Sequence, residues 1–395
     1  MLSVLQKKLR FGFLGLLIIL LNQCFYGHPV FGLYPPADEE DDQALFLLAG
    51  LGGSNPNTSS SSPTAPGSST NQTGTYIATL SGSTHLYTSR GDGSWTEITP
   101  SGLPGALVEV KKFGSLLIGV TGNNNETPYY SSDGGLSWSA ASASTGATNR
   151  FETVQVCGTR AMAIQNLNNT QYRAFGSSDG IAWGGLGALV NNTPFRGLLC
   201  MDDQNAALFV QNNAYTSSNA GLLWSGSDTT GLSNYTLDTP FGAAFNTGAS
   251  VTALIYAASG DVYAQHSTTK GASFDAAESV LASSGNPSFS GGMVHTANGF
   301  FAVMHLSGSP HYARVFKSPD GLRSNWSTVT DVDFGSVNFP ILKYGTANGN
   351  TILFSGQDNA GNAIAIQSDD GGATWTRVTS LPGTTAITSI TFAAD

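Results

Sequence analysis

Three arginines and one glutamate of this sequence could together bind an acidic group. The chain has nine arginines, and Arg150, Arg173 and Arg196 each stand at the start of a predicted strand, with Glu152 close to the first of them. Guanidinium groups form charge-assisted, often bidentate hydrogen bonds with carboxylates and sulfates. We therefore treat these four residues as a candidate ligand-binding site. The alternative is three unrelated arginines that are solvated or paired within their own loops.

The elements that would position these residues follow from a repeated motif of eight residues. It reads Ser-Ser-Asp-Gly-Gly-Leu-Ser-Trp at 131–138 and recurs, with variations, seven times at intervals of about 41 to 52 residues. Its short polar side chains can accept backbone N–H bonds inside a tight turn, and its glycines adopt backbone angles that other residues avoid. Its tryptophan would start the next strand and cover the hairpin. We interpret this motif, called the octet below, as structural.

Each period leaves room for four short strands, which is typical of a β-propeller. In the second period these strands are predicted at 107–110, 116–120, 129–131 and 138–140. The first period supplies only three strands, whereas the segment 386–392 has no octet of its own. That segment would complete the first blade as its innermost strand and so remove an exposed sheet edge. The sequence therefore predicts an all-β fold, a seven-bladed β-propeller with four-stranded blades over residues 75–395.

The predicted strand order brings the candidate residues to one rim of the propeller. Arg150 and Arg196 would begin the innermost strands of the third and fourth blades, and Arg173 would begin the third strand of the third blade. In antiparallel blades the first and third strands start on the same face, which is opposite the octets. We therefore expect ligand binding on the face away from the octets.

The octets resemble the Asp-box (BNR) repeat, Ser-x-Asp-x-Gly-x-Thr-Trp, of sialidases, sortilin-type receptors and other propellers. The fifth copy is degenerate, with Thr269 in place of the aspartate and phenylalanine in place of the tryptophan. The resemblance implies that the structural positions of the seven boxes are Asp92, Trp95, Asp133, Trp138, Asp179, Trp183, Asn219, Trp224, Phe274, Asp320, Trp326, Asp370 and Trp375.

The same resemblance raises the question of glycoside hydrolysis. Sialidases hold the substrate carboxylate with three arginines, the first of which precedes the first box, and attack with a tyrosine activated by a glutamate. Here residues 75–88 contain no arginine, and all six tryptophans belong to octets. The sequence thus favours a binding module without deciding on enzymatic activity. The alternatives are a sialidase-like glycoside hydrolase acting on glycans and an assembly factor for envelope proteins. We assign no catalytic residue and no cofactor.

Two further sets of side chains are candidates for a disulfide and for a metal site. Cys157 and Cys200 are one repeat apart on the innermost strands of neighbouring blades, and the sequence leaves both a disulfide and two buried free thiols open. A hairpin centred on 298–299 would pair His295 with Ala302 and place His305 on the opposite face of its sheet. The sequence therefore predicts no metal site.

The N-terminal segment has the features of an export signal. Lys7, Lys8 and Arg10 precede an apolar run at 11–21, which is too short to span a bilayer. Cys24 follows directly after residues 1–23 in a sequence that resembles a bacterial lipobox of the relaxed spirochaetal kind, with Gln23 where a small residue is usual. The resemblance implies that Cys24 is lipidated and becomes the new N-terminus. The alternative is an ordinary secretory signal with an incidental cysteine.

Composition completes the picture of an exported protein. Residues 24–74 include a run rich in Ser, Asn, Thr and Pro at 54–73, which cannot bury enough apolar surface to fold, so we expect a lipidated flexible tether. The net charge is −10 and becomes −13 without the leader, which argues against nucleic acid as a partner. We expect a monomeric lipoprotein of the bacterial cell envelope, at the outer membrane or cell surface, held to the membrane by its N-terminal lipid and presenting a module for a protein or glycan ligand.

Overall fold

The fold is described from a computed structural model of the chain. The structure describes residues 72–122, 127–143, 149–167, 171–191, 195–210, 213–227, 242–258, 261–281, 291–306, 310–336, 338–381 and 385–395. All of these belong to one compact unit, Gly67–Asp395. The expected signal peptide, Cys24 and nearly all of the expected tether lie outside these residues.

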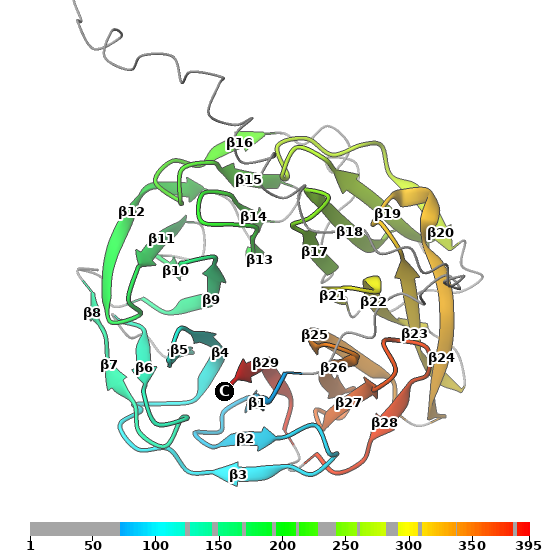
Figure 1. Cartoon of the computed structure of the whole chain (residues 1–395), viewed down its shortest axis with the longest axis horizontal. Coiled ribbons are helices and arrows are strands. Elements are labelled where there is room, and N and C mark those ends of the chain that lie inside the picture. Colours follow the sequence, from blue (N-terminus) through cyan, green and yellow to red (C-terminus); the bar gives the residue numbers. More distant parts are fainter. Residues whose placement is uncertain are drawn as a thin grey trace, which may run out of the picture. The chain divides into compact units, whose positions relative to one another are not determined.

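Seven antiparallel sheets, numbered here as blades 1 to 7, stand around a ring (Figure 1). Each blade has one strand next to the ring centre. In blade order these innermost strands are β29 (Ile387–Ala394), β4 (Leu107–Phe113), β9 (Phe151–Cys157), β13 (Phe195–Cys200), β17 (Gly242–Asn246), β21 (Gly292–Thr296) and β25 (Pro340–Asn348).

The remaining strands follow outward in each blade. The second strands are β1 (Gly74–Leu80), β5 (Leu116–Thr121), β10 (Arg160–Asn166), β14 (Ala206–Val210), β18 (Val251–Ala258), β22 (Gly299–Leu306) and β26 (Thr351–Asp358). The third strands are β2 (Leu86–Ser89), β6 (Tyr129–Ser131), β11 (Gln171–Ser177), β15 (Asn213–Ser217), β19 (Asp261–Ser267), β23 (His311–Ser318) and β27 (Ala363–Ser368). The outer strands are β3 (Thr96–Ile98), β7 (Ser139–Ala140), β12 (Ala182–Asn191), β16 (Ser225–Ser227), β20 (Glu278–Leu281), β24 (Ser327–Gly335) and β28 (Thr376–Val378).

The first blade is closed by the C-terminal strand, as the sequence predicted. β29 pairs antiparallel with β1 from Gly74 opposite Ala394 to Leu80 opposite Ile387. The seven-bladed fold is therefore confirmed, with one addition: the short strand β8 (Ser142–Ala143) pairs parallel with β12 and links the second blade to the edge of the third. Within the described part of the chain, the one helix is the 3-10 turn η1 (Arg323–Asn325), and no helix is long and apolar enough to cross a bilayer.

The core lies between the faces of neighbouring blades. Alternate side chains of each strand point to opposite faces of the sheet, so that one blade packs against both of its neighbours. Between blades 6 and 7, for example, Phe354 stacks on Trp375 with ring centroids 5.5 Å apart, and Phe301 lies 6.2 Å from the same tryptophan. This packing aligns the innermost strands around the ring centre.

Every octet turn is held by the hydroxyl of its first serine. Ser131 Oγ accepts the buried N–H of Gly135 at 2.9 Å, and the serine itself is 2% exposed. The same bond from a glycine N–H to the first serine occurs in all seven turns, whose serines are Ser89, Ser131, Ser177, Ser217, Ser267, Ser318 and Ser368. This bond satisfies a donor that the turn would otherwise bury without a partner.

The aspartate and tryptophan of the octet complete the turn in the second blade. Asp133 accepts the N–H of Ser137 at 2.9 Å and its hydroxyl at 2.5 Å, which together with the Ser131 hydroxyl lowers the pKa of Asp133 to about 2. Trp138 is buried and donates its indole N–H to the carbonyl of Gly135 at 3.0 Å. The octet thus uses its polar side chains inside the turn, as the sequence indicated.

Two octets deviate without losing the turn. In the fifth, Thr269 Oγ1 replaces the carboxylate and accepts the N–H of Ser273 at 3.0 Å, while Phe274 is buried in place of a tryptophan. In the sixth, η1 is inserted before Trp326, whose buried indole N–H has no hydrogen-bond partner among the described residues. The serine, the glycine that donates to it and the aromatic residue are therefore the parts of the octet that all seven turns keep.

Replacement of Ser131 by alanine should lower the free energy of unfolding by about 1–2 kcal/mol, because the buried N–H of Gly135 loses its acceptor. Ser132→Ala is the matched control, since Ser132 is exposed in the same turn. Denaturant unfolding of both variants measures the difference. Equal stabilities of the two variants would contradict the role given to the serine.

Candidate functional site

The innermost strands carry a positive charge that the protein as a whole lacks. Within their described residues they hold four cations and two carboxylates, and Arg150 lies one residue before β9. The cations are Lys111, Lys112, Arg196 and Lys343, and the carboxylates are Glu109 and Glu152. The chain in total carries −10. The ring centre is therefore the place where an acidic ligand would find favourable charge.

Arg150 and Glu152 form a close pair at the start of β9. Arg150 donates to Glu152 Oε1 from Nε at 3.1 Å, and its terminal nitrogen lies 3.0 Å from the same oxygen. Asn166, at the end of β10, donates to this oxygen at 2.6 Å. Half of the Arg150 side chain remains exposed, whereas that of Glu152 is 18% exposed. Glu152 thus orients Arg150 and neutralises part of its charge.

Tyr172 joins this pair to Arg196 of the next blade. Its hydroxyl accepts the backbone N–H of Phe195 at 2.9 Å. Burial raises the pKa of Tyr172, and the nearby charges of Glu152, Arg150 and Arg196 also act on it. Three of the four predicted residues therefore lie around one tyrosine hydroxyl between blades 3 and 4.

Arg173 does not join the other three residues. It follows Tyr172 on β11 and so points to the opposite face of the blade. Its guanidinium lies 5.2 Å from the ring centroid of Phe175, in the apolar layer between blades 2 and 3. A side chain at Gly185 of β12 would collide with it. The strand pleat turns the Arg173 side chain toward blade 2, whereas Arg196 lies on blade 4.

A cavity of about 140 Å³ lies at the ring centre and contains a cation that sequence reasoning missed. Arg196 of β13 and Lys343 of β25 both line it, together with apolar residues and glycines of β13, β17, β21 and β25. Lys343 stands at a register shift between Leu342 and Tyr344, where β25 carries one residue more than its partner strand. Such a bulge re-aims a side chain. The signal in the sequence was a single lysine within an otherwise apolar segment.

Glu109 is hydrogen-bonded to three residues of the neighbouring blade. It accepts hydrogen bonds from Thr153 Oγ1, from the N–H of Val154 at 3.1 Å and from Gln155 Nε2 at 2.7 Å, and Lys111 Nζ lies 3.0 Å away. Glu109 therefore links blade 2 to blade 3 and has donors at both of its carboxylate oxygens.

A tyrosine from blade 7 lies within electrostatic reach of Glu109. Burial, followed by the charge of Glu109, raises the pKa of Tyr344 to about 12. No hydrogen bond joins the Tyr344 hydroxyl to a carboxylate among the residues that the structure describes. A tyrosine nucleophile needs a base that lowers its pKa, and this arrangement raises it.

The histidines of blade 6 lie in a different register from the predicted one. β21 and β22 pair His295 with Phe300 rather than with Ala302, because the turn lies at residues 297–298 and not at 298–299, so that Gly299, at φ +113°, pairs with Thr296. The shift is an even number of residues, so His295 and His305 still face opposite sides. His305 Nε2 lies 3.4 Å from His311 Nδ1. No group of three or more metal-ligating side chains occurs among the described residues.

Cys157 and Cys200 are joined by a disulfide in the structure, with Cα atoms 4.9 Å apart. They end β9 and β13, on the face of the octets, and so fasten the innermost strands of blades 3 and 4 to each other. Of the two states that the sequence left open, the structure adopts the cross-linked one.

Comparison with known proteins identifies the fold and no family. No family model matches the chain, and no curated protein matches it. Two solved structures assigned as 6-phosphogluconolactonases, from Bacteroides fragilis and Bacteroides uniformis, are similar with a TM-score of 0.59 each and 9% and 10% identity. The similarity covers 82% of this chain and 98% and 100% of those chains.

A third similar structure is YCF48 bound to D1 peptide, at 16% identity and a TM-score of 0.47, over 78% of this chain and 91% of that chain. At such identities the likeness to these proteins concerns the propeller fold alone.

The disulfide should contribute about 2–4 kcal/mol to stability, because it restricts the unfolded chain. We expect a reductant to lower the denaturation midpoint of the wild-type protein. Cys200→Ser should show the lower midpoint without reductant and no further change when reductant is added. A wild-type midpoint that does not respond to reductant under denaturing conditions would contradict the cross-link.

Proposed function

We propose that this protein is an exported, membrane-anchored lipoprotein whose propeller binds an acidic group of a protein or glycan ligand at the ring centre. The observation that carries the proposal is the cavity flanked by Arg196 and Lys343. The two cations come from blades 4 and 7 and line one cavity together, although the protein as a whole is acidic.

The charge around this cavity supports an anionic ligand. Glu109 and Glu152 are already bound by Lys111, Arg150 and neutral donors, so they compete little with an incoming anion. Lys343 is exposed and has no ion pair with any residue of the described ranges. Arginine binds a carboxylate or sulfate through directed hydrogen bonds, and lysine adds a point charge.

Glycoside hydrolysis has a weaker basis than binding. The two carboxylates of the innermost strands each accept hydrogen bonds from several donors, and the pKa of Tyr344 is raised. A retaining or inverting hydrolase needs a carboxyl group that is free to transfer a proton. We therefore propose binding as the function of the ring centre.

Membrane anchoring rests on the N-terminal sequence. The basic start, the apolar run of eleven residues and Cys24 support acylation at that cysteine. A flexible tether after Cys24 would let the propeller reach its ligand away from the bilayer.

Arrays of glycans and peptides should show that the full chain prefers sulfated or carboxylated members to neutral ones. Arg196→Gln combined with Lys343→Gln should weaken binding of a preferred acidic member at least tenfold, and rising salt should weaken binding to the wild type. Arg173→Gln is the matched control, because it removes a cation of blade 3 that lies outside the cavity. Equal binding by the double variant, with an unchanged thermal midpoint, would refute the site.

Lipidation should be visible in the native host or a bacterial expression host. The full chain should take up labelled palmitate and partition into the detergent phase of Triton X-114, whereas Cys24→Ser should do neither. Cys200→Ser controls for loss of a cysteine elsewhere. Detergent partitioning and labelling that persist in Cys24→Ser would contradict the anchor.

A further inference from the structure

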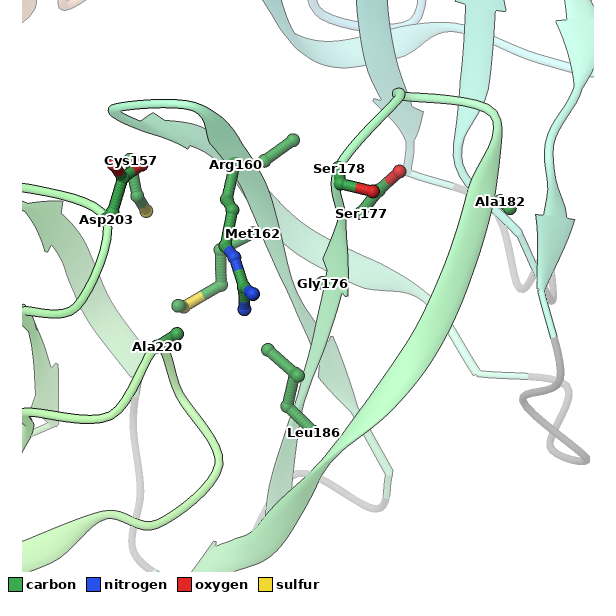
Figure 2. A pocket seen from close by; sticks show the side chains of 11 residues that line it. Cys157, Arg160, Met162, Gly176, Ser177, Ser178, Ala182, Leu186, Asp203 and Ala220 are labelled. Carbon is green, nitrogen blue, oxygen red and sulfur yellow. The ribbon is translucent and has the colours of Figure 1, made fainter. Parts of the chain in front are cut away.

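We infer that the protein has a second binding site, between blades 3 and 4 on the octet face, for a carboxylate carried on a short apolar chain. This site is separate from the ring-centre cavity and does not depend on the function proposed for it. It is a cavity of about 210 Å³, shown in Figure 2.

The cavity has apolar walls and one cation. Met162 of β10, Leu186 of β12 and Ala220 of the fourth octet line it, and Figure 2 shows their side chains around the same space. Arg160, the first residue of β10, extends into this space with its guanidinium on the side of Met162 and Leu186. The arrangement offers a charged end and an apolar body to one ligand.

Arg160 differs from every other arginine that the structure describes. No hydrogen bond, ion pair or ring contact joins it to another described residue. The other seven described arginines all interact with a neighbouring group: Arg90, Arg150, Arg173, Arg196, Arg314, Arg323 and Arg377. A guanidinium stays charged at all physiological pH values. The Arg160 side chain is exposed at the cavity, so its donors are accessible to a ligand there.

Asp203 defines the opposite end of the cavity. Its Oδ1 accepts the N–H of Thr159 and, at 2.8 Å, the Thr159 hydroxyl. Figure 2 shows it beside Cys157, on the side away from the Arg160 guanidinium. No ion pair joins Asp203 to Arg160 within the described part of the chain. The negative charge of Asp203 would repel a dianion and would orient the carboxylate of a monoanionic ligand toward Arg160.

The size of the cavity limits the ligand. Its volume is about 210 Å³, and Met162, Leu186 and Ala220 give it apolar walls. The site therefore fits a carboxylate with an apolar body of about four to six carbons.

Hexanoate is a direct probe of this chemistry. Saturation-transfer NMR on the full chain should show that hexanoate binds the wild-type protein, and that 1-hexanol binds at least tenfold more weakly. Arg160→Gln should weaken hexanoate binding at least tenfold. Arg90→Gln is the matched control, because Arg90 lies in an octet turn of the same face and is 73% exposed.

A second variant blocks the site without removing Arg160. Ser178 lines the cavity at an octet position where the seventh repeat has Asp369, so Ser178→Asp should be tolerated by the turn. Its carboxylate should occupy Arg160 and abolish hexanoate binding with an unchanged thermal midpoint. The variant of Arg196 and Lys343 should still bind hexanoate, which separates this site from the ring centre.

The source of the carboxylate is tested with a short peptide that ends in leucine. Tenfold tighter binding of the free acid than of hexanoate, with loss of binding for its C-terminal amide, would identify a protein chain end as the ligand. Equal binding of acid and hexanoate would identify a free organic acid. If neither probe binds the wild type more tightly than Arg160→Gln, the proposal is wrong.

Discussion

The bond from a buried serine hydroxyl to a glycine N–H is the interaction on which each blade depends. The third and outer strands meet at this turn, and the turn buries backbone donors that water cannot reach. A serine is small enough to lie inside the turn and accepts the bond without a charge that burial would penalise. The aspartate can be exchanged for Thr269 in the fifth blade because it bonds the exposed part of the turn. The serine is present in all seven turns because it bonds the buried part.

Because the octet turns lie on one face only, the two faces of the propeller differ. On the octet face, the polar side chains of the octets form hydrogen bonds within their own turns. The aromatic residues of the octets pack between blades. On the other face, the innermost strands begin without such a device, so side chains there are free to vary. Two cations of the innermost strands, Arg196 and Lys343, line one cavity, and Lys343 lies at a bulge rather than in a turn motif.

Much of the fold was predictable because its signals are local and repeated. The seven octets, the strand count and closure by the C-terminal strand follow from spacing alone. Side-chain direction was harder, because a shift of one residue in the pleat reverses the face. Arg173 illustrates this: its place on the strand was predicted, yet its side chain packs on Phe175 and not beside Arg196. Lys343 was missed because a bulge leaves no clear trace in a single sequence.

The surroundings of Arg160 could not be predicted from the sequence either, for a different physical reason. Its surroundings combine β10, β12 and the fourth octet turn, which are far apart in the sequence and meet only where two blades pack. Elsewhere on the octet face such junctions are filled, as where Phe354 stacks on Trp375 between blades 6 and 7. Between blades 3 and 4 the partner turn supplies Ala220, and its Trp224 is only partly buried. Cys157 lines the same cavity as Arg160 and Ala220, so the disulfide between Cys157 and Cys200 joins the two blades directly at this site.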